Sequence, residues 1–565
     1  MSGLKPQSQR ASESGSATTL AEVLVSQQVA HDAALPSIVL SKNLLDRRKF
    51  LIQAAALALS GGALVTLLEA CTAVKPLAPS PEPMPIALSP ELTPTVPPPP
   101  EAATETANLS PTPTTAPMPA ATPPTGLATE RARIGHLLRR AGFGATQTEL
   151  DRFTAMGVSA TVDYLLNYEQ VDDSALEARL NGLNLDLEKL VDLQRWWLLQ
   201  MIYSMRPLQE KMTLFWHGLL TSGFSKVGKG PYMYAQNQLL RKLCLSPYDQ
   251  LLKAIAQDAA MLIWLDSQVN KKAAPNENFA RELMELFSMG IGPYTEGDVR
   301  QSARAFTGWG LRQKVFNFTP EQHDFGTKIF LGRSGNFDGN DIIDIIMEQP
   351  ATAEFISRKL FTFFAYDDPA PEVVTKLAST FRNTQYSIKE VMREILISPE
   401  FYSAKAYRAK IKSPAELIAG MVHTLEIETD GSGLPAFADR MGQSLFNPFD
   451  VSGWPGGAVW INSNTLLQRL NFANRVSTAR SRRFQFTPVE TVRRLGLSSA
   501  DEVVTYFVHL LLDSNISVQE HNILVAFGQG LNILGEPLGS QSPSVDEKLR
   551  SVVYLILAAP EYQLA

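Results

Sequence analysis

The sequence predicts an all-α protein: a large, mostly helical globular domain of one or two lobes, with a short β-hairpin near 315–331. Three observations support this class. Apolar side chains recur with a helical period of about 3.6 residues in seven segments after position 129. Residues that favour helix starts and stops flank the clearest further segment. Finally, 47 of the 48 aromatic residues lie after position 128, so the material for a core is confined to 129–565.

The seven periodic segments account for most of the predicted helices. The first carries Leu190, Leu193, Trp197 and Met201 in helical spacing, and Pro207 separates it from the second. The segments are 187–204, 208–220, 350–366, 386–397, 413–425, 500–512 and 544–558.

The clearest single element runs from Asn276 to Met289. Asn276 is a capping residue type, and Gly290 supplies a stop. One buried stripe is expected from the positions of Phe279, Leu283, Leu286 and Phe287. Further on, Thr295-x-x-Asp298 resembles a capping box and predicts a second helix that continues to Phe306.

The exception to helix is the segment 315–331. Phe316-x-Phe318 and Lys328-Ile329-Phe330-Leu331 flank a polar turn, which fits a short hairpin. This turn contains His323 and Asp324, with Lys328 nearby. An adjacent imidazole and carboxylate could bind a metal or share a proton. The alternative is a structural turn, in which Asp324 hydrogen-bonds its own backbone and His323 packs.

Composition divides the chain into three parts: an export signal in 1–70 with a long N-terminal region, a tether in 71–128 and a helical domain in 129–565. Residues 72–128 hold 17 of the 37 prolines, no aromatic residue and five charged residues, which predicts an extended, disordered segment. The segment 129–565 has 44 Lys+Arg and 48 Asp+Glu, a net charge of −4. This balance excludes a basic nucleic-acid-binding surface.

An export signal is indicated by Arg47 and Arg48, which precede a mostly apolar run from Phe50 to Leu68. This arrangement resembles a bacterial twin-arginine signal. Leu68-Glu69-Ala70-Cys71 resembles a lipoprotein processing box, in which Cys71 would receive the lipid, although Glu69 departs from the usual small or apolar residue. The alternatives are simple cleavage and an uncleaved apolar anchor. The second cysteine, Cys244, has Leu on both sides and is expected to be a buried apolar residue.

Three segments are distinctive: Asn276-Glu277-Asn278-Phe279-Ala280-Arg281-Glu282-Leu283-Met284-Glu285-Leu286-Phe287, Ala303-Arg304-Ala305-Phe306-Thr307-Gly308-Trp309 and His323-Asp324-x-Gly326-x-Lys328. Together with other segments they resemble the bacterial "domain of unknown function 1800" family. The resemblance covers nearly all of 129–565 and implies an exported, mostly helical protein. Such proteins are often encoded beside a second secreted family, and the resemblance implies no established activity.

Motifs of common enzyme classes are absent from the sequence: it has no phosphate-binding loop, no H-E-x-x-H and no G-x-S-x-G. The candidate catalytic residues are therefore His217, Glu282, His323 and Asp324. His217 follows Leu214-Phe215-Trp216 and is more simply a core histidine, while Glu282 and its acidic neighbours favour ion pairs with Arg300 and Arg304. The sequence assigns no metal and no cofactor.

One further histidine lies in a basic segment. His136 is surrounded by Arg131, Arg133, Arg139 and Arg140, where it could join an anion site. The alternative is a solvated basic helix face.

These observations predict an exported, membrane-tethered bacterial envelope protein, held by lipidated Cys71 or by an apolar anchor. Its expected role is a binding or scaffold module for a secreted protein partner. The alternative is an extracytoplasmic hydrolase or metal-dependent enzyme that uses the His323/Asp324 loop and the Glu282 helix.

Overall fold

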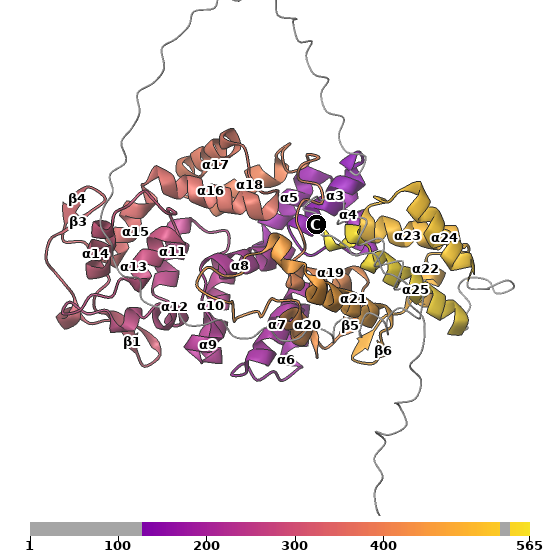
Figure 1. Cartoon of the computed structure of the whole chain (residues 1–565), viewed down its shortest axis with the longest axis horizontal. Coiled ribbons are helices and arrows are strands. Elements are labelled where there is room, and N and C mark those ends of the chain that lie inside the picture. The colour runs from indigo at the N-terminus through magenta and orange to yellow at the C-terminus, as the bar shows by residue number, and fades with distance from the viewer. Residues whose placement is uncertain (1–126, 531–542) are drawn as a thin grey trace, which may run out of the picture. The chain divides into compact units, whose positions relative to one another are not determined.

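The computed structural model describes residues 127–530 and 543–565, and Figure 1 shows them as helices joined by short loops. Within these residues lie 23 α-helices and three small sheets. The all-α class is therefore confirmed. The predicted export residues Arg47 and Arg48, the lipidation residue Cys71 and the tether up to 126 lie outside the described residues.

The first ten helices precede all strands. They are α3 (Glu130–Arg140), α4 (Gln147–Met156), α5 (Val158–Leu166), α6 (Ser174–Asn181), α7 (Leu190–Tyr203), α8 (Pro207–Leu219), α9 (Phe224–Val227), α10 (Gly230–Lys242), α11 (Tyr248–Ala256) and α12 (Ala259–Trp264).

The central segment combines helices with two hairpins, which lie together in Figure 1. Its elements are α13 (Asn278–Glu285), α14 (Glu296–Ala305), β1 (Trp309–Arg312), β2 (Val315–Phe318), β3 (Lys328–Phe330), β4 (Arg333–Gly335) and α15 (Gly339–Met347). The predicted pairing within 315–331 is wrong, because β2 pairs with β1 and β3 pairs with β4. The capping box at Thr295 and Asp298 is confirmed. Asn276 is not the N-cap of α13, although its Oδ1 accepts from the Asn278 N–H.

Ten further helices complete the described chain. They are α16 (Pro350–Phe364), α17 (Pro371–Asn383), α18 (Ile388–Ile397), α19 (Pro414–Thr424), α20 (Leu434–Arg440), α21 (Ser463–Ser477), α22 (Pro488–Arg494), α23 (Ala500–Leu512), α24 (Val518–Gly530) and α25 (Pro543–Ala558). The third sheet has the antiparallel order β5-β7-β6, formed by β5 (Glu428–Thr429), β7 (Phe484–Gln485) and β6 (Arg480–Ser481).

Two apolar cores hold these helices. The first contains Trp216, Tyr248 and Phe306, and the second contains Trp197 and Phe472, all almost fully buried. Burial of apolar area on this scale is the main stabilising contribution in the described residues, whose one cysteine is free. Cys244 is completely buried in the first core, as expected.

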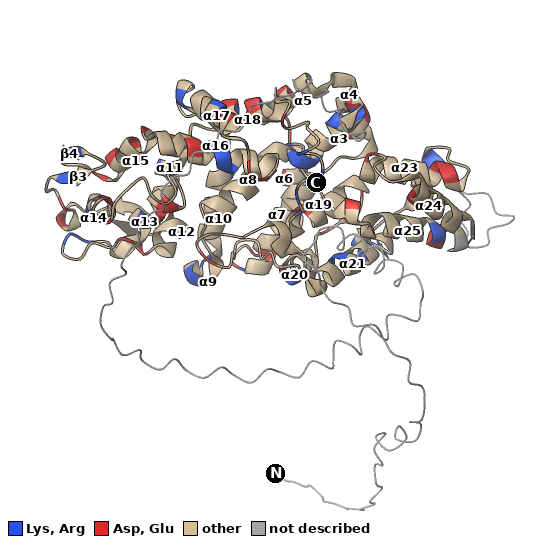
Figure 2. Ribbon diagram, turned by 45° about the horizontal axis from the view of Figure 1, so that its top comes forward, with Lys and Arg blue, Asp and Glu red and all other residues tan. Residues whose placement is uncertain are grey.

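Buried ion pairs join helices of the two cores. Lys211 on α8 pairs with Glu416 on α19, and Arg139 on α3 pairs with Asp513 at the end of α23. Elsewhere Lys, Arg, Asp and Glu are scattered over most elements (Figure 2). In the described ranges no helix is both long and apolar enough to span a membrane.

Candidate functional site

The His323–Asp324 loop lies between β2 and β3 and packs on the end of α14. Its position depends on Gly308, which has φ +82° and follows the last turn of that helix. A Cβ at this position would lie 2.6 Å from the Thr319 carbonyl oxygen and 3.2 Å from the His323 nitrogen. Glycine is therefore required both for the backbone conformation and for the close approach of the loop.

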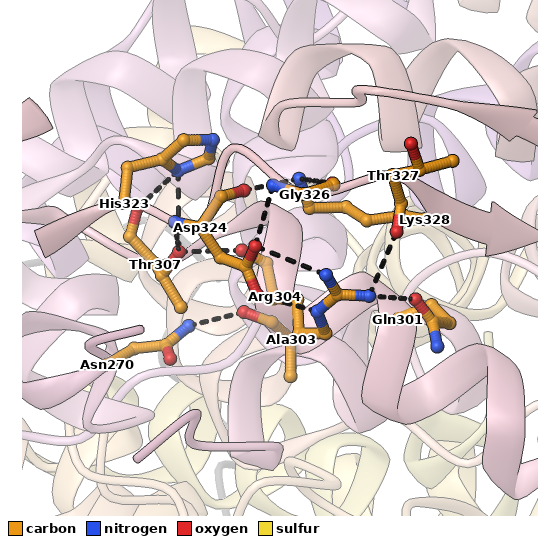
Figure 3. Close-up of polar contacts among 10 residues, drawn as sticks. All are labelled: Asn270, Gln301, Ala303, Arg304, Thr307, His323, Asp324, Gly326, Thr327 and Lys328. Atoms are coloured by element: carbon orange, nitrogen blue, oxygen red, sulfur yellow. Dashed lines mark hydrogen bonds and ion pairs between the residues drawn. The ribbon is translucent and has the colours of Figure 1, made fainter. Parts of the chain in front are cut away.

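The Asp324 carboxylate is fully engaged by its neighbours. Arg304 donates from Nε to Oδ2 at 2.6 Å and from Nη2 to Oδ1 at 3.1 Å, a two-point pairing that Figure 3 shows. The Gly326 N–H also donates to Oδ1. The hydrogen bond from Arg304 lowers the pKa of Asp324 to about 2. At neutral pH this carboxylate is an ionised structural partner and a poor proton acceptor.

His323 is held by backbone and aromatic contacts. Its Nδ1 lies 2.8 Å from the Thr307 carbonyl oxygen, which can only accept, so Nδ1 carries the proton. The ring packs edge-on against Phe318 and Phe325, with centroid separations of 5.3 and 4.6 Å. No hydrogen bond connects His323 with Asp324 in the described structure, and the Asp324 N–H instead donates to the Thr307 hydroxyl. The adjacent pair therefore does not act as a proton relay in this geometry.

Lys328 completes the loop from β3. Its side chain is buried, and Nζ donates to the carbonyl oxygens of Asp324 at 2.5 Å and Gly326 at 3.2 Å. Burial lowers the pKa of this ammonium group. Lys328 thus binds two carbonyl oxygens of the turn, just as Arg304 of α14 binds the Asp324 carboxylate.

The other two candidates from the sequence are His217 and Glu282. In the described residues, neither makes a hydrogen bond, an ion pair or a ring contact with this loop. His217 is 1% exposed, packs against the rings of Trp197, Phe446 and Trp454, and has no hydrogen-bond partner on either ring nitrogen. Burial lowers its pKa to about 4. Glu282 makes neither a hydrogen bond nor an ion pair with the other candidates in the described residues, and burial raises its pKa.

Across residues 127–530 and 543–565, no group of three or more His, Cys, Asp or Glu side chains could hold a metal ion. The ion pairs also differ from the prediction for the Glu282 helix. Arg281 pairs with Glu277 and Glu296, whereas Arg304 pairs with Asp324. The sequence predicts that Arg304 pairs with a glutamate of α13, but its partner is Asp324, in the loop between β2 and β3.

In the basic segment around His136, Arg139 and Arg140 are buried, so the expectation of a solvated face is wrong for them, whereas Arg133 is exposed. His136 is 0% exposed and places Nε2 2.9 Å from the Phe401 carbonyl oxygen. Arg139 and Arg140 are buried beside it; Arg140 donates to the carbonyl oxygens of Phe363 and Phe364.

Some residues that build the loop were not singled out by sequence reasoning. Thr307 holds His323 through its carbonyl and Asp324 through its hydroxyl, and Asn270 holds the end of α14 by donating to Ala303 O. Neither residue belongs to a chemical motif. Sequence reasoning also assigned aromatic residues to the core, yet Phe325 is 58% exposed and Phe318 is 40% exposed.

The fold and the loop together define a class: a mostly helical protein with a charged loop that is fixed by internal ion pairs and carries exposed aromatic rings. The chain belongs to the family described as "Protein of unknown function (DUF1800)", whose model matches residues 136–564. A search of curated proteins found no match, and a search of solved structures found none either.

Proposed function

We propose that this chain is an exported bacterial envelope protein, tethered to the membrane through its N-terminal segment, and that its helical region binds an acidic secreted protein. The observation that carries the proposal is the contrast, at this loop, between charged groups that are bonded to the protein and aromatic rings that are exposed to solvent. The Asp324 and Lys328 side chains bond to neighbouring groups, while the rings of Phe318 and Phe325 stay exposed beside them; Glu321 is an exposed charged residue of the same loop. Exposed apolar groups that cluster on a fixed scaffold are typical of docking surfaces.

The docking surface that we propose is centred on Phe318 and Phe325, which are 40% and 58% exposed. Phe318 and Phe325 both pack on His323, so the buried histidine orders the two rings. Ordered aromatic side chains lose little conformational entropy on binding, which makes them effective anchors.

Four basic side chains are exposed near this docking surface, together with one acidic side chain, Glu321. Lys271 and Lys272 are exposed on the loop that contacts the hairpins, where the Lys272 N–H donates to Gln322 O at 2.8 Å. Arg312 and Lys314 are exposed at the tip of the β1–β2 hairpin. This charge favours a partner with acidic groups around an apolar centre, because complementary charges increase the association rate and orient the encounter.

The partner proposal is tested by a photo-crosslinking residue placed at position 325 of the exported chain. Phe449, which is 92% exposed outside the docking surface, is the matched control position. We expect an acidic secreted protein to crosslink from 325 and not from 449, and the crosslink to disappear when Lys271 and Lys272 are both changed to Glu. Equal crosslinking from both positions, or none from 325, would contradict the proposal.

The export part is tested separately. Replacing Arg47 and Arg48 by Lys should retain the full-length chain in the cytosol, because the receptor distinguishes the guanidinium pair from lysine. Replacing Cys71 by Ala should abolish labelling with a lipid precursor. Normal export of the double Lys variant would rule out the twin-arginine signal, and an unlabelled wild type would leave only cleavage or an apolar anchor.

A further inference from the structure

A small cavity of about 20 Å³ lies between α3, α19, α23 and the segment that precedes α19. Its apolar wall includes Phe143, Leu510 and the Tyr562 side chain, and its polar wall includes Arg139, Lys412 and Thr424. We call it the Arg139–Lys412 cavity. Its volume accommodates about one water-sized or halide-sized species.

Three residues on the polar wall each have an N–H or O–H that no protein acceptor takes up in the described structure. Arg139 is 9% exposed, and its Nε has no hydrogen-bond partner in the described residues. Lys412 is 6% exposed and donates one N–H to Tyr562 O at 2.8 Å, with Nζ 3.6 Å from the centroid of the Tyr562 ring. A third N–H of this ammonium group remains. The Thr424 hydroxyl makes no hydrogen bond with any described residue.

The carboxylate on the cavity wall already accepts hydrogen bonds from neighbouring side chains. Asp513 is the one carboxylate on its wall, and Arg139 donates to its Oδ1 at 2.7 Å. Arg408 and the Tyr407 hydroxyl approach Oδ2, each at 3.4 Å. Two cations, Arg139 and Arg408, therefore share one carboxylate in a region shielded from water.

Lys412 has no ion-pair partner among the described residues, so nothing there neutralises its charged form. Burial, together with Arg408 and Arg139, lowers the pKa of Lys412 well below its usual value. Removing a charge from water without a counter-charge is strongly unfavourable, so a group that supplies one negative charge and accepts hydrogen bonds would stabilise the folded state.

We propose that the Arg139–Lys412 cavity binds one halide-sized inorganic anion, chloride under physiological conditions, which accepts hydrogen bonds from Arg139 Nε, Lys412 Nζ and Thr424 Oγ1. The cavity volume excludes phosphate, sulfate and organic acids. The bound anion would connect α3, the segment before α19 and the end of α19. It would act as a structural ion, and this inference is independent of the docking surface at the hairpins.

The test is thermal unfolding of the full chain, purified without halide, in sodium bromide or chloride against sodium gluconate at equal ionic strength. We expect the melting temperature to rise with halide concentration in a saturable manner, because a ligand that binds only the folded state stabilises it. Crystals grown in bromide should show anomalous density between Arg139 and Lys412. Equal melting curves in halide and gluconate, or a water molecule in place of bromide, would overturn the proposal.

Two pairs of variants locate the site. Thr424→Val should weaken the apparent halide affinity about tenfold, because it removes one hydrogen bond to a charged ligand. Thr161→Val is the matched control, a buried threonine outside the cavity whose hydroxyl donates to Gly157 O. Lys412→Met should abolish the halide effect, whereas Lys410→Met, which removes a pair with Asp367, should retain it. If Thr424→Val and Thr161→Val respond to halide identically, the proposed site is wrong, whether or not Lys412→Met folds.

Discussion

The Asp324 carboxylate accepts hydrogen bonds from Arg304 on α14 and from the Gly326 N–H in its own turn. Its side chain is 22% exposed, so water screens the pair only in part. The folded-state pKa of about 2 lies below the usual value of an aspartate in an unfolded chain. The stabilisation is therefore fully present above about pH 4 and is lost as the pH falls towards 2.

From this geometry we predict that Asp324→Asn lowers the free energy of unfolding at pH 7 by about 1–3 kcal/mol, because Arg304 loses its charged acceptor. Urea unfolding at constant pH measures the change. Glu321→Gln, an exposed neighbour without an ion pair in the described residues, should change stability by less than about 0.5 kcal/mol. Unchanged stability of Asp324→Asn would show that the loop is not held by this pair.

A second residue-scale prediction concerns His423 on α19. Nδ1 lies 2.7 Å from Ile202 O and Nε2 lies 2.8 Å from Glu149 Oε2, and both partners are acceptors. The ring satisfies both only when it carries two protons. Burial alone would lower the pKa of His423, but Glu149 raises it above the ordinary value.

The pair therefore stabilises the fold below about pH 6.5, and this contribution is lost as the pH rises through the raised folded pKa. We expect the stability advantage of wild type over His423→Gln to shrink between pH 6 and pH 9, as measured by urea unfolding at several pH values. An advantage that stays constant over this range would mean that the imidazole is neutral throughout.

At the scale of elements, α13 shows whether residues of an apolar stripe predicted from the sequence contribute to the packed core. Leu283 is 0% exposed and Leu286 is half-buried on the same helix end. We predict that Leu283→Ala lowers the free energy of unfolding by about 2–5 kcal/mol, because a cavity remains in the packed core. Leu286→Ala, at the C-cap of α13, is the control and should have a clearly smaller effect in the same urea assay. Similar losses for both would indicate that the helix packs differently.

Helices could be predicted well because each carries its signal locally. The segments predicted at 208–220, 350–366 and 500–512 correspond to helices at Pro207–Leu219, Pro350–Phe364 and Ala500–Leu512. The hairpins could not be paired correctly for a physical reason. Each strand turns back at once through two residues with positive φ, Gln313-Lys314 and Leu331-Gly332. Only the second pair contains a glycine, so the first turn carries no sequence signal.

At the scale of the whole molecule, the two cores meet across buried charges that come from distant parts of the chain. Arg139, Lys412 and Asp513 come from distant parts of the chain, yet they line one small cavity, and Arg408 approaches Asp513 beside it. Taken singly in the sequence, each looks like an ordinary surface residue. The sequence could therefore indicate the His323–Asp324 loop, whose members are adjacent, but not this cluster, which only the tertiary fold assembles.

The Lys211–Glu416 pair has the strongest expected effect on the whole molecule, because it joins α8 to α19 while buried. Burial alone would raise the pKa of Glu416, but Lys211 and Arg140 lower it to about 2. A carboxylate with a lowered folded pKa stabilises the fold above its unfolded value of about 4.3, and this contribution is lost as the pH falls through the folded value. Wild type should therefore lose stability between about pH 5 and pH 2.

We predict that Glu416→Gln lowers the free energy of unfolding at pH 7 by about 3–5 kcal/mol, because it leaves the Lys211 ammonium buried without a counter-charge. The variant should also lose less stability than wild type between pH 5 and pH 2.5, since it has no carboxylate to protonate at this position. Glu428→Gln removes an exposed pair with Arg179 and is the control, with an expected loss below about 1 kcal/mol. Urea unfolding at pH 7, 5 and 2.5 measures all three proteins. Parallel acid dependence in wild type and Glu416→Gln would show that this pair does not couple the stability of the two cores to pH.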